Sequence, residues 1–206
     1  MRDRWYGDAR DLVKWATLVH LAQENKVQTI LQVAFYRPDE EAHPLLEDDK
    51  PVGFPSSVLK HFPHNLEDIR RLGSQIQLNI EVFQEAFTED RASYFEKLKD
   101  RITSLGGSKF IVFLDPDTGI AGRRPGLSHV LLADVQRVFS WLKPSDWLVL
   151  YQHQQRYRGW VAQNRQRFQQ TLQTKTPPKI KTFSSNLAKD VVFFAAEKPR
   201  RTRPTP

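Results

Sequence analysis

Cysteine is absent from this 206-residue chain. Without it there can be no disulfide bond, no thiolate nucleophile, and no zinc or iron–sulfur cluster held by cysteine. Any metal ion would have to be bound by oxygen atoms or imidazole rings. The histidines include no His-x-x-x-His pair, so we predict no histidine-based metal site on a helix.

Long apolar runs are also missing. No segment approaches the roughly 18 apolar residues that a membrane span needs, and the start, Met1-Arg-Asp-Arg, is charged where a signal peptide is apolar. We therefore predict a cytoplasmic protein that does not bind membranes. The length suits one domain, which we place at residues 1–198, followed by a disordered basic tail at 199–206. The oligomeric state is left open.

Three well-known catalytic motifs are absent as well: the Walker loop, Gly-x-Ser-x-Gly, and Gly-x-Gly-x-x-Gly after a strand. What the chain does have is positive charge, with 31 Lys and Arg against 24 Asp and Glu, a net charge of +7. This excess favours a polyanionic partner, DNA or RNA. We expect Arg123, Arg124, Arg156 and Arg158 to contact phosphates, although a solvated surface would also explain such arginines.

The hydrophobic pattern alternates between helical and strand periodicity along the chain. It predicts a three-layer α/β sandwich with a mostly parallel, Rossmann-like sheet and a C-terminal antiparallel pair of strands. The expected helices are residues 8–24, 66–72, 90–105, 130–142 and 159–173, and a further short one is plausible at 56–61. The expected strands are residues 28–36, 76–83, 110–114, 146–151, 179–183 and 190–196.

Polar and ionisable residues follow three of these strands. The sharpest case is the apolar run 110–114, which ends in Asp115-Pro-Asp-Thr-Gly119. Ligands of parallel sheets bind beyond the carboxyl ends of the strands, so we expect these groups to share one edge and form a site. The three groups are Asp39 with Glu40, Asp115 with Asp117, and Gln152 with His153 and Arg156.

These side chains are compatible with more than one chemistry. Carboxylates can bind Mg²⁺ or Mn²⁺, or accept hydrogen bonds from a substrate amino or hydroxyl group. His153 has the ring of an acid, base or ligand. The purely structural alternatives are a turn in which Gly119 has a positive φ, a structural histidine at 153, an N-cap at Asp8 and an ion-paired Lys14.

Two stretches resemble known families: the segment from Gly7 to Leu21, containing Gly-Asp and Lys14, and Asp115-Pro-Asp-Thr-Gly119 with Tyr151-Gln-His153 downstream. Together they resemble a set of uncharacterised bacterial proteins over roughly residues 5 to 158. More distantly, the chain resembles Rossmann-like S-adenosylmethionine-dependent methyltransferases that modify adenine N6 in ribosomal RNA.

That second resemblance implies that Asp115 binds the target amino group and that Lys14 lies near the cofactor. In those enzymes the matching strand ends in Asp-Pro-Pro-Tyr, and a glycine-rich loop follows the first strand. Here Tyr36-Arg-Pro-Asp-Glu40 replaces that loop, which is a departure from the pattern that binds S-adenosylmethionine. The candidate cofactor contacts are Asp8, Asp39 and Glu40.

Three hypotheses result. The first is a nucleic-acid-acting enzyme of methyltransferase-like fold, with Asp115, Asp117, His153 and Lys14 as catalytic residues. The second is a Mg²⁺- or Mn²⁺-dependent nuclease that binds metal through Asp39, Asp115 and Asp117. The third is a non-catalytic nucleic-acid-binding module that has lost its cofactor site.

Overall fold

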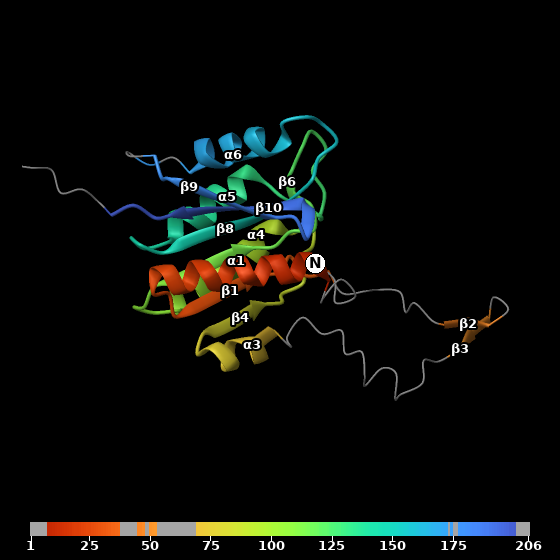
Figure 1. The fold of residues 1–206 in the computed structure, drawn as a ribbon, viewed down its shortest axis with the longest axis horizontal. Coiled ribbons are helices and arrows are strands. Elements are labelled where there is room, and N and C mark those ends of the chain that lie inside the picture. Colours follow the sequence, from red (N-terminus) through yellow and green to blue (C-terminus); the bar gives the residue numbers. More distant parts are fainter. Residues whose placement is uncertain are drawn as a thin grey trace, which may run out of the picture.

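A six-stranded sheet forms the centre of the molecule, with strand order β4-β1-β5-β8-β10-β9 (Figure 1). The computed structural model describes residues 8–37, 69–172, 174 and 177–200, and the backbone of 45–47 and 50–52. The sheet strands are β1 (Thr29–Val33), β4 (Asn79–Phe83), β5 (Phe110–Leu114), β8 (Trp147–His153), β9 (Ile180–Ser185) and β10 (Ala188–Glu197).

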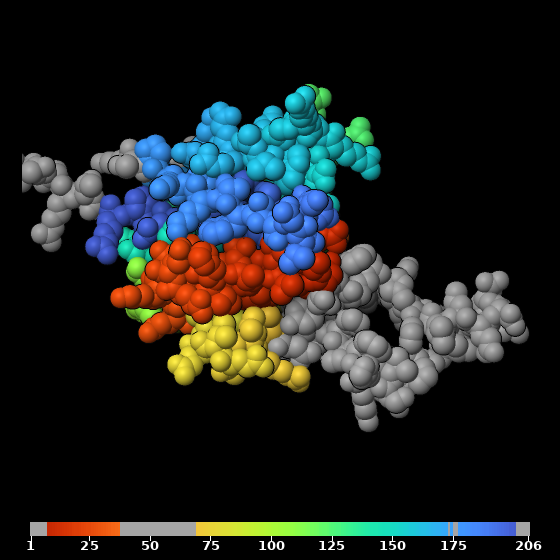
Figure 2. Space-filling model, in the orientation of Figure 1, coloured from red at the N-terminus to blue at the C-terminus, as the bar shows by residue number. Residues whose placement is uncertain are grey.

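Helices cover both faces of this sheet and give it three layers. One face packs against α1 (Ala9–Asn25) and α3 (Ile69–Ile76), and the other packs against α4 (Arg91–Ser104), α5 (Leu132–Trp141) and α6 (Trp160–Thr171). Figure 2 shows α1 in red across the middle of its face, with α3 in yellow beside it. The predicted α/β sandwich is confirmed.

The strand directions agree with the prediction too. Strands β4, β1, β5 and β8 are parallel, and β10 runs antiparallel to both β8 and β9. The central strands β1 and β5 are buried along their whole length, as expected for strands covered on both sides. The predicted C-terminal antiparallel pair is therefore present, with β10 inserted between β8 and β9.

Two short pairs lie outside the main sheet. Strand β6 (Gly119–Ile120) runs parallel to β7 (His129–Val130), and β2 (Leu45–Glu47) is antiparallel to β3 (Lys50–Val52). None of the helices in the described ranges is long and apolar enough to cross a membrane. The short helix expected at 56–61 and the tail from 201 onward lie outside the described residues.

Several predicted element boundaries were wrong. Strand β1 ends at Val33 instead of Tyr36, and β4 begins at Asn79 instead of Ile76.

Helix α3 continues through Gly73 to Ile76 instead of ending at the glycine. A Cβ at position 73 would lie 2.4 Å from the Leu78 carbonyl oxygen. The glycine thus permits close packing of α3 on the turn before β4. Val130 belongs to β7 and not to α5. Strand β8 continues to His153, because β10 pairs with it up to that residue.

Candidate functional site

The N-terminal end of α1 brings four charged side chains, Asp8, Arg10, Asp11 and Lys14, to the carboxyl end of the parallel strands. Asp8 caps the helix, accepting hydrogen bonds from the backbone nitrogens of Arg10 at 2.8 Å and Asp11 at 3.0 Å. The N-cap interpretation of Asp8 is therefore confirmed. Lys14 lies one turn after Asp11, so both side chains point to the same side of the helix, towards the end of β5.

A buried ionic cluster joins this helix to the sheet. The Nζ atom of Lys14 lies 2.6 Å from Asp11 Oδ1 and 2.9 Å from Asp115 Oδ2. The whole residues are only 6%, 4% and 3% exposed for Asp11, Lys14 and Asp115. A buried lysine between two carboxylates is the pairing that buried charges require, so the ion-paired interpretation of Lys14 is confirmed.

The protonation of Lys14 is set by two opposing influences. Burial by itself lowers the pKa of Lys14, but the negative charges of Asp115 and Asp11 and their hydrogen bonds raise that pKa above its usual 10.5. Lys14 is therefore a permanent cation at neutral pH. Its Nζ also lies 5.9 Å and 6.0 Å from the ring centroids of Tyr151 and Phe113, within the range of cation–π attraction.

Asp115 receives a second donor from the neighbouring strand. Gln32, fully buried in β1, donates from Nε2 to Asp115 Oδ2 at 2.7 Å. The backbone nitrogen of Asp115 donates to the Val33 carbonyl oxygen at 3.0 Å. The carboxylate that ends β5 is thus held from both α1 and β1.

The turn after Asp115 is fixed by Gln152 at the end of β8. Gln152 accepts from the backbone nitrogen of Ile120 at 2.9 Å and donates to the carbonyl oxygen of Thr118 at 3.1 Å. Gly119 has a φ of +95°, as the turn interpretation of this motif predicted. Asp117, in the same turn, forms an ion pair with Arg37 beyond β1.

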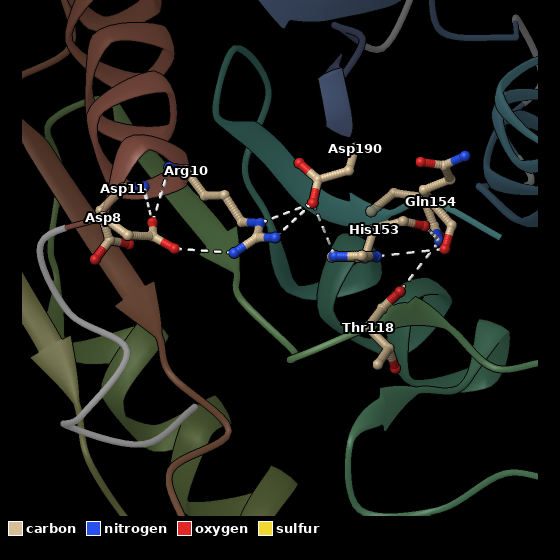
Figure 3. Close-up of polar contacts among 8 residues, drawn as sticks. Asp8, Arg10, Asp11, Thr118, His153, Gln154 and Asp190 are labelled. Atoms are coloured by element: carbon tan, nitrogen blue, oxygen red, sulfur yellow. Dashed lines mark hydrogen bonds and ion pairs between the residues drawn. The ribbon is translucent and has the colours of Figure 1, made fainter. Parts of the chain in front are cut away.

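A chain of alternating charges borders the site on the other side (Figure 3). Asp190, in β10, accepts from Arg10 Nε at 3.0 Å and from Arg10 Nη2 at 2.5 Å, and its Oδ2 lies 3.3 Å from His153 Nε2. Arg10 also pairs with Asp8 at 3.0 Å. The hydrogen bond with Arg10, more than any other influence, lowers the pKa of Asp190.

His153 therefore meets an oxygen atom at each ring nitrogen. Its Nε2 faces Asp190 and its Nδ1 lies 3.3 Å from the Gln154 carbonyl oxygen. These two contacts fix the orientation of the ring at the border of the cavity.

These groups surround one cavity of about 390 Å³. Its lining holds four carboxylates against two permanent cations, Arg10 and Lys14, together with the imidazole of His153. Burial, followed by the charge of Asp115, raises the pKa of the Tyr151 phenol far above its usual value, so this group stays neutral and can donate or accept a hydrogen bond. The lining residues are Asp8, Arg10, Asp11, Lys14, Asp115, Pro116, Asp117, Tyr151 and His153.

The cavity brings together five side chains that the sequence singled out: Asp8, Lys14, Asp115, Asp117 and His153. Asp39 and Glu40 lie outside the described residues. The four expected phosphate contacts, Arg123, Arg124, Arg156 and Arg158, are exposed on the loops that follow β6 and β8 and do not line the cavity. Figure 2 shows these loops, in green and cyan, at one corner of the molecule.

Other residues of the site were not predicted. Gln32 carried a usable signal, since a polar residue inside an otherwise buried, apolar strand needs a polar partner. Asp11 lies three residues before Lys14 on the buried side of α1, which is a weaker signal. Arg10 and Asp190 are 180 positions apart, and only the insertion of β10 beside β8 brings them together.

The sequence suggested two groups that this cavity could bind, a divalent metal ion and S-adenosylmethionine, and the metal ion is considered first. Within the described ranges no three acidic or histidine side chains are placed to hold a metal ion, and the Oδ2 atom of Asp115 already accepts from Lys14 and Gln32. Since Asp39 lies outside those ranges, the predicted set of Asp39, Asp115 and Asp117 is untested.

The described part of the segment after β1 differs from a glycine-rich loop. Phe35, fully buried, adopts a left-handed backbone conformation with a φ of +46°, which costs free energy in a residue other than glycine. Its ring packs edge-on against Phe87 with centroids 4.8 Å apart. Residues 38–44, which continue this segment, lie outside the described residues, so the predicted cofactor contacts Asp39 and Glu40 are untested.

No protein-family model matches this sequence, and no curated protein matches it either. Among solved structures, the fold is similar to the crystal structure of a DUF574 family protein from Streptomyces avermitilis MA-4680. The two sequences are 13% identical, the match covers 93% of this chain and 82% of that chain, and the TM-score is 0.37. A likeness at this level does not assign the chain to that family, and the resemblances noted in the sequence stay predictions.

Proposed function

We propose that this protein is a nucleic-acid-acting enzyme of Rossmann-like, methyltransferase-like fold that acts on an amino group of a base. The observation that carries the proposal is the position of Asp115. It ends a buried parallel strand, is held by Lys14 and Gln32, and lines the cavity at the edge of the sheet where ligands of such sheets bind.

Asp115 has the properties of a hydrogen-bond acceptor for a substrate. Its bonds with Lys14 and Gln32 both involve Oδ2, which leaves Oδ1 to accept from a donor in the cavity. The Nζ atom of Lys14, 2.9 Å from Oδ2, and the amide of Gln32 hold the carboxyl group in one orientation. An ionised carboxylate can accept from an exocyclic amino group and orient the nitrogen lone pair for attack.

The distribution of charge suits a nucleic acid that places a base in the cavity and keeps its phosphate backbone on the protein surface. Carboxylates outnumber permanent cations in the cavity lining, four to two, so the cavity favours hydrogen-bond donors and disfavours phosphate. The exposed arginines of the two neighbouring loops have the opposite preference. This arrangement suits an enzyme that takes a base out of the stack and leaves its phosphates at the surface.

Methyl transfer also needs a methyl donor. S-adenosylmethionine supplies an electrophilic methyl group when bound, and Asp8 and Asp11 at the cavity are acceptors suited to its ammonium group. Asp39 and Glu40, the other predicted cofactor contacts, follow β1 in the sequence. The chain's own contribution to the reaction would be to hold the amino group at Asp115 and exclude water from it.

Two measurements test this proposal: titration calorimetry with S-adenosylmethionine, and transfer of labelled methyl groups to RNA and DNA. We expect saturable cofactor binding and transfer that falls about 100-fold in Asp115→Asn, the cost typical of losing one preorganised polar contact. Asp100→Asn, an exposed acid on α4, is the matched control and should retain full activity.

The same experiments distinguish the rival hypotheses. Mn²⁺ binding that disappears in Asp117→Asn, together with cleavage of nucleic acid, would replace methyl transfer by the nuclease hypothesis. Nucleic-acid binding with neither cofactor nor metal would support the non-catalytic module. Either result would overturn the enzyme proposed here.

A further inference from the structure

The loop between β8 and α6 exposes an aromatic ring between two arginines. Tyr157 is 41% exposed and stands between Arg156 and Arg158, both exposed. Most large apolar side chains in the described ranges are buried, whereas Tyr157, Leu12 and Leu187 are exposed. An exposed ring in a basic loop is a recurrent feature of surfaces that bind nucleic acid.

The exposed ring is held in place by its hydroxyl group. Tyr157 donates to Gln155 Oε1 at 2.7 Å, and Asn164 Nδ2 lies 3.4 Å from the Tyr157 hydroxyl oxygen. Asn164 also donates to the same Gln155 oxygen at 2.8 Å and is itself fully buried. The hydroxyl group is thus tethered to a buried amide of α6 while much of the ring faces solvent.

The same buried asparagine connects this loop to the second basic loop. Arg167 of α6 donates from Nη1 to Asn164 Oδ1 at 3.0 Å and from Nη2 to the Ala121 carbonyl oxygen at 2.7 Å. Residues 121–126, which carry Arg123 and Arg124, begin at that carbonyl. One network centred on Asn164 therefore fixes the positions of both basic loops.

We propose that Tyr157 is a stacking platform for a base of single-stranded nucleic acid, with the loop arginines contacting the phosphates on either side. This inference rests on the proposed function, because it specifies the strandedness of the same nucleic-acid substrate. A ring fixed in advance loses little conformational freedom on binding. Stacking needs an accessible base face, which a duplex keeps within its own stack.

Tyr157 is near enough to the cavity along the chain for one nucleic-acid strand to contact both. Tyr157 follows His153, which lines the cavity, by only four residues, a chain distance of at most about 14 Å. His153 is the last residue of β8, and Tyr157 lies in the loop that follows this strand. The loop between β8 and α6 is on the right-hand side of Figure 1. A strand stacked on Tyr157 could therefore place a nearby base in the cavity.

The test is fluorescence anisotropy of the full chain with a labelled 12-nucleotide single strand, as RNA and as DNA, and with its duplex. We expect Tyr157→Ala to weaken single-strand binding about 5- to 100-fold, the usual range for loss of one base–aromatic stack. Tyr157→Trp should retain the affinity. Tyr157→Phe should lose less than Tyr157→Ala, because the ring stays while the tether is lost.

Salt dependence separates stacking from charge. Arg156→Ala and Arg158→Ala should each reduce the slope of log affinity against log salt by about 0.7, whereas Tyr157→Ala should leave the slope unchanged. Lys179→Ala removes one exposed positive charge just before β9, at the opposite end of the sheet, and is the control for net charge. We expect Lys179→Ala to bind as the unmodified chain does.

Three outcomes would overturn the inference: wild-type affinity in Tyr157→Ala, an equal loss for single strand and duplex, or a loss in Lys179→Ala as large as in Arg156→Ala. Tyr157 is exposed, so the circular dichroism of its variants should be unchanged. If the spectrum of Tyr157→Ala is altered, the comparison is made with Tyr157→Trp instead.

Tyr157-dependent binding without cofactor binding or methyl transfer would leave this inference standing and reject the proposed function. Methyl transfer independent of Tyr157 would do the reverse.

Discussion

Gln152 occupies the space that a side chain at position 119 would need. A Cβ atom built on Gly119 would lie 2.5 Å from Gln152 Oε1 and 2.7 Å from its Nε2. That amide is fully buried and bonds to the backbone on both sides of Gly119. The shape of the Asp115-Pro-Asp-Thr-Gly119 turn, and hence the position of Asp117, therefore depends on this glycine.

Gly119→Ala should destabilise the protein by about 2–4 kcal/mol. The φ of +95° is unfavourable for alanine, and the new methyl group would displace a buried amide with all its hydrogen bonds. Urea unfolding followed by circular dichroism measures the change. Gly122→Ala is the matched control, since its Cβ would meet no atom within 4 Å and its φ is not positive. Equal stability of the two variants would contradict this account of the turn.

Lys14→Met should cost about 3–5 kcal/mol, because it leaves two buried carboxylates without their cation. Asp115→Asn added to Lys14→Met should recover part of this loss, since one uncompensated charge is removed. Chemical denaturation of the two single variants and the double variant gives the coupling energy between Lys14 and Asp115.

Lys97→Met provides the surface comparison for that cycle. Lys97 pairs with Glu85 at 2.7 Å, but the two side chains are 58% and 46% exposed, so we expect a loss below about 1 kcal/mol. If Lys14→Met and Lys97→Met lower the free energy of unfolding by similar amounts, burial does not make the ion pairs of Lys14 more important for stability than a surface ion pair.

The sequence was informative wherever local pattern determines structure. The apolar run of β5 and the Asp8 cap of α1 both come from neighbouring residues, and both were found where predicted. Because parallel strands end at a common edge, Asp115 and His153 could also be expected to meet. Their shared cavity follows from the direction of two strands, which periodicity and connection length together indicate.

Other parts of the site depend on the order of strands in the sheet, which no local pattern encodes. Asp190 reaches Arg10 and His153 only because β10 lies beside β8 and not at the edge of the sheet. The end of β8 was placed too early for the same reason: pairing with β10 extends it over the polar residues Gln152 and His153. The polarity of Gln152 and His153 predicted that the strand ends before them, but pairing with β10 extends the strand through both residues.

Stability should fall above about pH 10 in a way that depends on Tyr151. Burial, and then the charge of Asp115, raises the pKa of Tyr151 well above its usual 10.0, and the pKa of Lys14 is also raised. A raised pKa in the folded state favours the protonated form, so the stabilisation is complete below the unfolded pKa and is lost as pH rises beyond it.

Tyr151→Phe should make that alkaline loss shallower, by about 2–3 kcal/mol between pH 10 and 12. Urea unfolding at fixed pH values between 8 and 12 gives both profiles. Parallel profiles for wild type and Tyr151→Phe would show that the Tyr151 phenol does not stay protonated in the folded protein.

Asp190 should show the opposite dependence, in acid. Its pKa lies below the usual 3.8, chiefly through the hydrogen bond from Arg10, so its stabilisation is present above pH 3.8 and is lost as pH falls through the folded pKa. Arg10→Gln and Asp190→Asn should each cost about 0.5–1 kcal/mol at pH 7, because the pair is partly exposed. The double variant should cost little more than either alone. Unfolding curves from pH 7 to pH 2.5 should therefore show differences from wild type that shrink as pH falls below 3.8. Differences as large at pH 2.5 as at pH 7 would mean that packing of the Arg10 side chain, and not its charge, accounts for the effect.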